Sequence, residues 1–156
     1  MSKFNKTVVI TGANRGIGLA MTKICLQRGN KVYALCRQSS PQLTAHDTDT
    51  NLNIVDNVDI ATESGIKVAT NALINITIDL LINNAGILRD ENLTNLNSAT
   101  IIEQFHVNAL APLQFTHALL ENLTKGSKVA MITSRMGSIA DNDSGGRYGY
   151  LCQKLH

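Results

Sequence analysis

The segment TGANRGIG, residues 11–18, constrains the fold of this chain more than any other part of it. It follows the β-branched run KTVVIT (6–11) and precedes a stretch, about 15–28, whose apolar residues recur with helical period. Residues without a Cβ atom let backbone N–H groups approach a bound phosphate at a helix N-terminus. Three such residues stand in this turn: Gly12, Gly16 and Gly18. The order of strand, glycine turn and helix predicts a dinucleotide-binding unit, although the spacing is G-x-x-x-G-x-G rather than G-x-G-x-x-G.

The rest of the chain alternates short apolar runs with amphipathic stretches. We expect strands at 31–36, 52–60, 79–86 and 127–134, helices at 62–74 and 98–123, and a polar surface loop at 39–51. Ser98 is the expected N-cap of the long helix and Pro112 an internal kink, and the last strand is apolar enough for burial on both faces. This pattern predicts one α/β domain over residues 1–156, with a doubly wound, Rossmann-like parallel sheet that binds ligands beyond the carboxyl ends of its strands.

Composition restricts the class of partner. A net charge of +2, without runs of lysine or arginine, gives no electrostatic footprint for nucleic acid or an anionic membrane. No apolar run is long enough to cross a bilayer and the first residues lack a signal-peptide pattern, so a cytoplasmic location is expected. Cys25, Cys36 and Cys152 lack the spacing of metal ligands, and no metal is predicted. The partner expected is a small molecule.

The end of the second expected strand bears on the choice of cofactor. NAD enzymes of this architecture carry an acidic residue about 20 residues after the glycine turn, where it bonds the ribose 2′-hydroxyl. This chain has Cys36 and Arg37 there. An arginine suits a 2′-phosphate, and Arg15 in the glycine turn offers a second positive charge. These charges favour NADP(H) over NAD(H).

Five motifs occur in the order and spacing of the short-chain dehydrogenase/reductase family, which the chain resembles over essentially its whole length. They are TGANRGIG (11–18), NNAG (83–86), VNALAP (107–112), ITS (132–134) and Tyr150-x-x-x-Lys154. The segment SRMGSIADNDSGGRYGY is similar to the branch that contains bacterial C-factor and the sniffer-type carbonyl reductases. The resemblance implies an oxidoreductase that reduces a small carbonyl compound with NADPH.

The resemblance also implies which residues bind the cofactor. Those that would hold the pyrophosphate are Gly12, Gly16, Ile17 and Gly18, and those that would line the adenosine ribose and the adjoining backbone are Asn84, Ala85 and Gly86. In such proteins an acid at the end of the third strand caps the adenine. Counting back from the following helix favours Asp59 for this role, with Asp56 as the alternative.

Four residues match the catalytic positions of the family: Asn108, Ser134, Tyr150 and Lys154, with Ser138 as the rival serine. Hydride transfer to a carbonyl leaves negative charge on its oxygen, so a proton donor is needed. The tyrosine would donate the proton, and the lysine one helical turn away would favour the phenolate form. The serine would hydrogen-bond the substrate oxygen, and the asparagine would hold a water that relays protons to the lysine.

Members of the family usually continue well past the tyrosine, whereas this sequence ends at His156. We therefore expect a domain that is incomplete at its C-terminal end, with helices and strands missing. The helix of Tyr150 would fall short of the roughly 12 to 15 residues needed for marginal autonomous helicity. The last strand would become an exposed apolar edge. A homo-oligomer is expected for the full-length form and is doubtful for this one.

The last six residues, LCQKLH (151–156), depart from the family pattern, which reads something like MSKAAL. They can be encoded as CTA TGT CAA AAG CTG CAT TAA, and the same bases in a shifted frame read Met-Ser-Lys-Ala-Ala-Leu. We hypothesise that one base was lost after the codon of Tyr150, by mutation or sequencing error, which would make Lys154 a lysine by coincidence. The expectation is a weakly active or inactive reductase. The alternatives are a non-catalytic dinucleotide-binding or C-factor-like signalling module, and an inert fragment.

Overall fold

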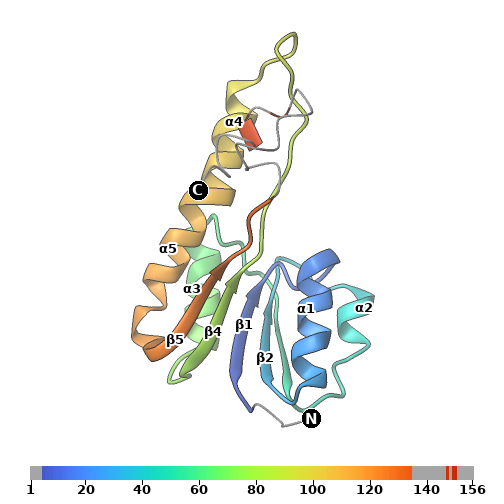
Figure 1. Ribbon diagram of the computed structural model, residues 1–156, viewed down its shortest axis with the longest axis vertical. Coiled ribbons are helices and arrows are strands. Elements are labelled where there is room, and N and C mark those ends of the chain that lie inside the picture. The colour runs from blue at the N-terminus through green and yellow to red at the C-terminus, as the bar shows by residue number, and fades with distance from the viewer. Residues whose placement is uncertain (1–4, 135–146, 148, 151–156) are drawn as a thin grey trace.

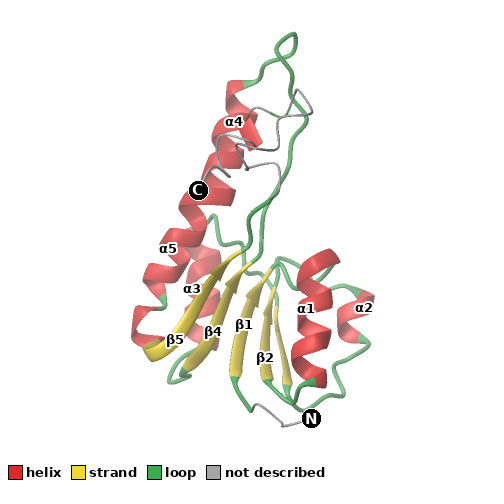
Figure 2. Ribbon diagram, in the orientation of Figure 1, coloured by secondary structure: helices red, strands yellow, loops and turns green. Residues whose placement is uncertain are grey.

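A parallel sheet of five strands lies at the centre of the fold (Figure 1 and Figure 2). The computed structural model describes residues 5–134, 147, 149 and 150. The strands are β1 (Thr7–Thr11), β2 (Lys31–Leu35), β3 (Leu52–Val55), β4 (Ile78–Asn83) and β5 (Leu123–Met131). Their order is β3-β2-β1-β4-β5, and each neighbouring pair is parallel. The predicted doubly wound α/β sheet is confirmed.

Helices cover both faces of the sheet (Figure 2). One face carries α1 (Gly16–Gln27) and α2 (Pro41–Thr44), and the other carries α3 (Glu63–Ala72) and α5 (Ala111–Ala118). Helix α4 (Ser98–Phe105) precedes α5 and rises beyond the carboxyl ends of the strands (Figure 1). The chain between β4 and α4 extends in the same direction, so that this end of the molecule projects away from the sheet.

Alternation of side chains along β1 divides the core into two layers. Val8 and Ile10 pack with apolar residues of α1 and α2, whereas Val9 packs with Ala69 of α3 and Phe115 of α5. None of these five side chains is more than 2% exposed. A run of β-branched residues suits a central strand of this kind, which is buried on both faces.

β1 and β4 lie side by side in the middle of the sheet. β1 pairs with β2 on one side and with β4 on the other, so the order of the strands reverses between β1 and β4. Open parallel sheets bind ligands in the crevice at such a reversal, outside the carboxyl ends of the strands. The glycine turn follows β1 at this point, and the segment NNAG begins with the last residue of β4.

The single long helix predicted at 98–123 is interrupted. A π-helical turn, η1 (His106–Leu110), separates α4 from α5, and a 3-10 turn, η2 (Leu120–Asn122), leads directly into β5. Pro112 has no N–H to donate to the carbonyl four residues before it, which explains why the regular hydrogen-bond ladder fails here. The kink predicted at Pro112 stays a prediction; the structure shows a π-turn that ends just before α5, of which Pro112 is the second residue.

The N-cap of α4 is Asn97 rather than the predicted Ser98. The side-chain oxygen of Asn97 accepts hydrogen bonds from the N–H groups of Ala99 and Thr100, over 3.0 and 3.3 Å. Both residue types favour the N-cap position, so the sequence alone did not decide between two neighbours. Ser98 is the first residue of the helix instead.

β5 forms an edge of the described sheet, where it pairs with β4. The prediction that it is buried on both faces is wrong, because Val129 and Met131 are 43% and 49% exposed. The prediction of an exposed apolar edge agrees with these values. An edge of this kind offers backbone N–H and C=O groups to a further strand.

Other bounds also differ from the prediction. The expected polar loop at 39–51 contains the short helix α2, whose Leu43 is fully buried and whose N-cap, Ser40, accepts from the N–H of that leucine. β3 and β4 end at Val55 and Asn83, earlier than predicted. Within the described ranges, no helix has the length and apolar character needed to cross a bilayer.

Candidate cofactor-binding and active site

The glycine turn depends on the absence of side chains at three positions. Gly12 and Gly16 have φ values of +65° and +53°, in the left-handed region that favours glycine. At Gly18 the constraint is space, because a Cβ atom there would stand 2.2 Å from the carbonyl oxygen of Gly12. Helix α1 can therefore begin directly against the turn.

The N-terminus of α1 is open in front of this turn. Arg15 occupies the N-cap position without a side-chain hydrogen bond to the first helical turn, and that turn contains no acidic residue. A Cβ atom on Gly16 would meet nothing within 4 Å, and Ile17 is 65% exposed. Backbone N–H groups and the positive end of the helix dipole make such a place suitable for a phosphate.

Thr11 joins the glycine turn to the segment NNAG. Its Oγ1 accepts hydrogen bonds from the backbone N–H groups of Asn84 and Ala85, each over 3.0 Å. The side-chain amide of Asn84 donates in return to the carbonyls of Thr11 and Gly12, over 2.9 and 3.2 Å. Sequence reasoning missed Thr11, which is fully buried. Its position at the end of β1, directly before the first glycine, was the available signal.

The end of β2 combines a buried thiol with an exposed cation. Arg37 is exposed, whereas Cys36 is buried and donates its thiol to Asp56 Oδ1 over 3.2 Å. The hydroxyl of Ser39 donates to the other oxygen of the same carboxylate over 2.9 Å. Burial, and then the hydrogen bond and negative charge of Asp56, raise the pKa of Cys36 to about 12. The thiol is therefore protonated near neutrality.

The two acids considered for the adenine have different surroundings. Both carboxylate oxygens of Asp56 are engaged by Cys36 and Ser39. Asp59 lies in the turn before α3, where its Oδ1 accepts from the N–H of Ala61 over 3.0 Å. A Cβ atom on Gly65 would stand 2.2 Å from the carbonyl oxygen of Asp59, so this turn packs tightly against α3. The binding role of Asp59 stays a prediction.

Asn108 lies in the π-helical turn η1 and is 5% exposed. Its side-chain amide makes a pair of hydrogen bonds with the backbone of Ile87, donating to the carbonyl and accepting from the N–H, each over 2.8 Å. A Cβ atom on Gly86 would stand 3.0 Å from Asn108 Oδ1. Asn108 therefore fixes the chain just after the segment NNAG, and its predicted part in a proton relay stays a prediction.

The remaining predicted catalytic residues lie near the end of the described chain. Ser134 follows β5 by three residues and is half-buried. Tyr150 is also half-buried and, with Gly149, has helical backbone conformation. Lys154 and the rival serine, Ser138, lie outside the described residues. Gly149, directly before Tyr150, lies against Ile101 and Gln104 of α4.

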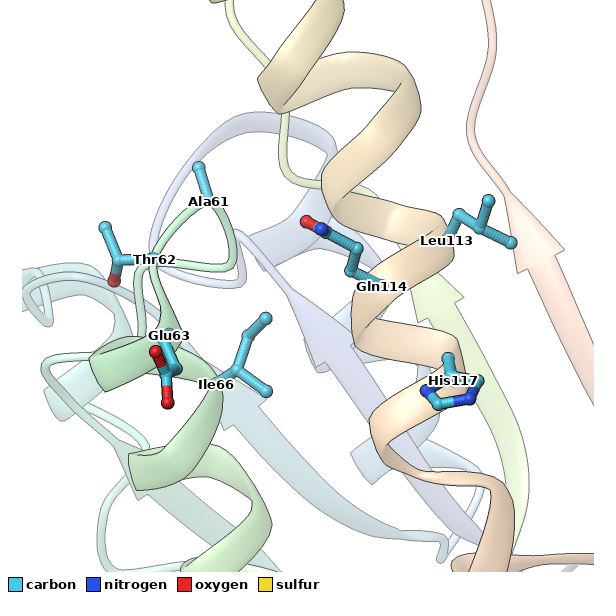
Figure 3. A pocket seen from close by; sticks show the side chains of 7 residues that line it. All are labelled: Ala61, Thr62, Glu63, Ile66, Leu113, Gln114 and His117. Atoms are coloured by element: carbon cyan, nitrogen blue, oxygen red, sulfur yellow. The ribbon is translucent and has the colours of Figure 1, made fainter.

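A groove of about 600 Å³ lies between α3 and α5 (Figure 3). It is lined by Ala61, Thr62, Glu63, Ile66, Leu113, Gln114 and His117. None of the predicted binding or catalytic residues that the structure describes lines it. The groove lies on the face of the sheet that α3 and α5 cover.

The chain belongs to the short-chain dehydrogenase family, because the family model described as "short chain dehydrogenase" matches residues 6–149. Among curated relatives, 1-hydroxy-2-glutathionyl-2-methyl-3-butene dehydrogenase of Rhodococcus sp. (strain AD45) is 29% identical over 150 residues, which cover 95% of this chain and 65% of the relative. C-signal of Myxococcus xanthus is 44% identical over 80 residues, which cover 49% of this chain and 48% of the relative. The chain thus spans between about half and two thirds of these relatives.

A solved structure supports the same assignment. The carbonyl reductase of Pseudomonas aeruginosa PAO1, crystallised in complex with NADP, is 33% identical and superposes with a TM-score of 0.86. The superposition covers 96% of this chain and 70% of the Pseudomonas chain. Members of this family are oxidoreductases, and their fold is the one described above.

Proposed function

We propose that this chain is the cofactor-binding part of an NADP(H)-dependent oxidoreductase that reduces a small carbonyl compound. The observation that carries the proposal is the open N-terminus of α1. This helix packs so closely against the glycine turn that a Cβ atom on Gly18 would stand 2.2 Å from the carbonyl oxygen of Gly12. A relative of the same fold is crystallised with NADP, which supports this choice of cofactor.

The described residues fit such a cofactor. The free space in front of Gly16 and the first N–H groups of α1 would receive the pyrophosphate. The exposed cations Arg15 and Arg37 would face the 2′-phosphate of the adenosine ribose. The other binding residues proposed are Gly12, Ile17, Gly18, Asp59, Asn84, Ala85 and Gly86.

NADPH, when bound, supplies the hydride that the carbonyl carbon accepts. Tyr150 would then give its hydroxyl proton to the carbonyl oxygen, so that the product is an alcohol. Ser134 would donate a hydrogen bond to the same oxygen and hold the substrate in place. Lys154 would replace the proton lost by the tyrosine, and a water held at Asn108 would relay protons to the lysine.

A titration with each dinucleotide tests the choice of cofactor. We expect Arg37→Ala to weaken NADPH binding by about tenfold or more and to leave NADH binding within about twofold, because a phosphate–arginine contact is charge-assisted. Arg28→Ala is the matched control, since Arg28 is an exposed arginine at the opposite end of α1. Equal losses for the two dinucleotides would contradict a 2′-phosphate contact of Arg37.

A second measurement tests catalysis. Oxidation of NADPH is followed at 340 nm over a panel of aldehydes and ketones, with Tyr150→Phe to remove the proton donor and Tyr148→Phe as the control. Turnover that is lost in the first variant alone supports the reductase. Saturable binding without any turnover supports the second candidate, a non-catalytic or signalling module, which the identity of 44% to C-signal over 80 residues favours. Absence of binding would contradict both.

A further inference from the structure

A buried carboxylate lies in the projecting end of the molecule, away from the glycine turn. Glu91, in the chain between β4 and α4, is 4% exposed and forms no ion pair within the described part of the chain. A buried carboxylate is costly unless hydrogen bonds compensate for the lost water. The partners of Glu91 therefore indicate what the residue does.

One oxygen of Glu91 holds two donors. Its Oε1 accepts from the side-chain amide of Gln104 over 3.0 Å and from the backbone N–H of Gly149 over 2.9 Å. The other oxygen, Oε2, is buried and has no hydrogen-bond partner among the described residues. All of the described stabilisation of this carboxylate therefore comes from α4 and from the residue that directly precedes Tyr150.

Gln104 is itself held in one orientation. It is fully buried on α4, and its Oε1 accepts from the backbone N–H of Arg89 over 2.8 Å. Because that oxygen faces a donor, the amide nitrogen must face Glu91. A continuous series of hydrogen bonds thus runs from Arg89 through Gln104 and Glu91 to Gly149.

The segment before Tyr150 is attached at two further points. The backbone N–H of Arg147 donates to the carbonyl of Glu91 over 2.8 Å, and its Nε donates to Asp90 Oδ1 over 2.7 Å. Gly149 also has no room for a side chain, since a Cβ atom would stand 2.2 Å from Glu91 Oε1 and 2.8 Å from Ile101. Both described residues of the segment before Tyr150 are thus hydrogen-bonded to the chain between β4 and α4.

We propose that Glu91, oriented by Gln104, is a positioning residue that fixes the helical backbone on which Tyr150 is carried. Gly149 has helical backbone conformation, and its N–H donates to Glu91 Oε1 over 2.9 Å. The side chain of Glu91 thus holds this backbone from a part of the chain 58 residues away. The catalytic consequence rests on the function proposed above, in which Tyr150 is the proton donor.

The test follows the position of Tyr150 directly, so that it does not depend on turnover. The full chain is labelled with 3-fluorotyrosine, the fluorine resonance of Tyr150 is assigned by its loss in Tyr150→Phe, and amide exchange of Gly149 is measured alongside. In Glu91→Leu we expect the Tyr150 resonance to shift, the resonance of the core residue Tyr33 to stay in place, and Gly149 to exchange about tenfold faster.

Two variants complete the design. Glu91→Gln keeps an oxygen acceptor and should restore most of the protection of Gly149. Glu103→Gln is the control, because Glu103 is a neighbouring acid on α4 that instead pairs with Arg89 at the surface. An unchanged Tyr150 resonance and unchanged exchange of Gly149 in Glu91→Leu would overturn the inference, whatever the chain does with NADPH.

A fold that collapses in Glu91→Leu is recognised by loss of the native Tyr33 resonance. In that case Gly149→Ala tests whether Glu91 positions Tyr150, because the new Cβ atom would displace the carboxylate while Glu91 stays in the chain. A shifted Tyr150 resonance with native Tyr33 supports the inference, and an unshifted one overturns it. Loss of the sheet in both variants also overturns it, because a residue that only positions Tyr150 is not required for the central strands.

Discussion

A Cβ atom on Gly18 would lie 2.2 Å from the carbonyl oxygen of Gly12, closer than any van der Waals contact permits. Gly18→Ala must therefore push α1 away from the glycine turn. We expect a loss of about 1 to 3 kcal/mol in the free energy of unfolding, the usual cost of overpacking, together with loss of NADPH binding. Urea denaturation and a dinucleotide titration measure the two effects.

Gly16→Ala is the matched comparison for that variant. A Cβ atom at position 16 meets nothing within 4 Å, so its cost comes from the left-handed backbone alone and amounts to about 1 kcal/mol. The contact between Gly18 and Gly12 would be contradicted if the two alanine variants had equal stability.

Thr11 should be the most sensitive hydroxyl near the glycine turn. Thr11→Val leaves the N–H groups of Asn84 and Ala85 without their acceptor in a buried place, and we expect a loss of about 2 kcal/mol or more. Thr11→Ser should recover most of it. The control is Thr22→Val, because the buried hydroxyl of Thr22 only donates to the carbonyl of Gly18 within α1. Thermal unfolding of the three variants compares them.

The local part of this site could be predicted from the sequence. The strand, the glycine turn and the helix are formed by consecutive residues, so the turn from Gly12 to Gly18 and its place after β1 were expected. The role of Thr11 was not expected, because its hydroxyl accepts a hydrogen bond from Asn84, which lies 73 residues further along the chain. Likewise, nothing near Cys36 in the sequence indicates that Asp56 will hold its thiol.

Other predictions were wrong where neighbouring residues have the same preference for a structural position. Asn97 and Ser98 are both good N-caps, and in the structure the side chain of Asn97 is the one that accepts from the first turn of α4. Pro112 predicted a kink, whereas the structure has a π-turn whose Asn108 makes a pair of hydrogen bonds with Ile87. Such contacts join residues 21 positions apart, beyond the reach of helical periodicity.

Alanine substitutions at Asn97 and Ser98 compare the two candidate N-caps of α4 directly. Asn97→Ala removes the acceptor for two N–H groups and should cost about 1 kcal/mol of the free energy of unfolding. Ser98→Ala should change it by less than about 0.5 kcal/mol, because position 98 lies inside the helix, where alanine is favoured. Urea denaturation of both variants tests the assignment, which a larger loss in Ser98→Ala would reverse.

The thiol of Cys36 should react slowly although it lies beside the proposed cofactor site. Burial and Asp56 raise its pKa from 9.0 to about 12, so that its thiolate is about 1,000-fold scarcer near pH 8 than that of an ordinary cysteine. Alkylation by iodoacetamide, followed by mass spectrometry of the peptide that contains Cys36, measures this. Because the folded pKa is the higher one, the associated stability is complete below pH 9 and is lost as the pH rises toward 12.

Asp56→Asn separates the effect of burial on the pKa of Cys36 from the effect of Asp56. It removes the charge and weakens the hydrogen bond while leaving burial, the largest cause, in place. We therefore expect faster alkylation of Cys36 that still falls below the rate of the unfolded chain. Asp59→Asn is the control, because its carboxylate instead accepts from the N–H of Ala61. If both variants accelerated alkylation equally, general loosening of the β3 end would explain the rate, and the contact between Asp56 and Cys36 would not.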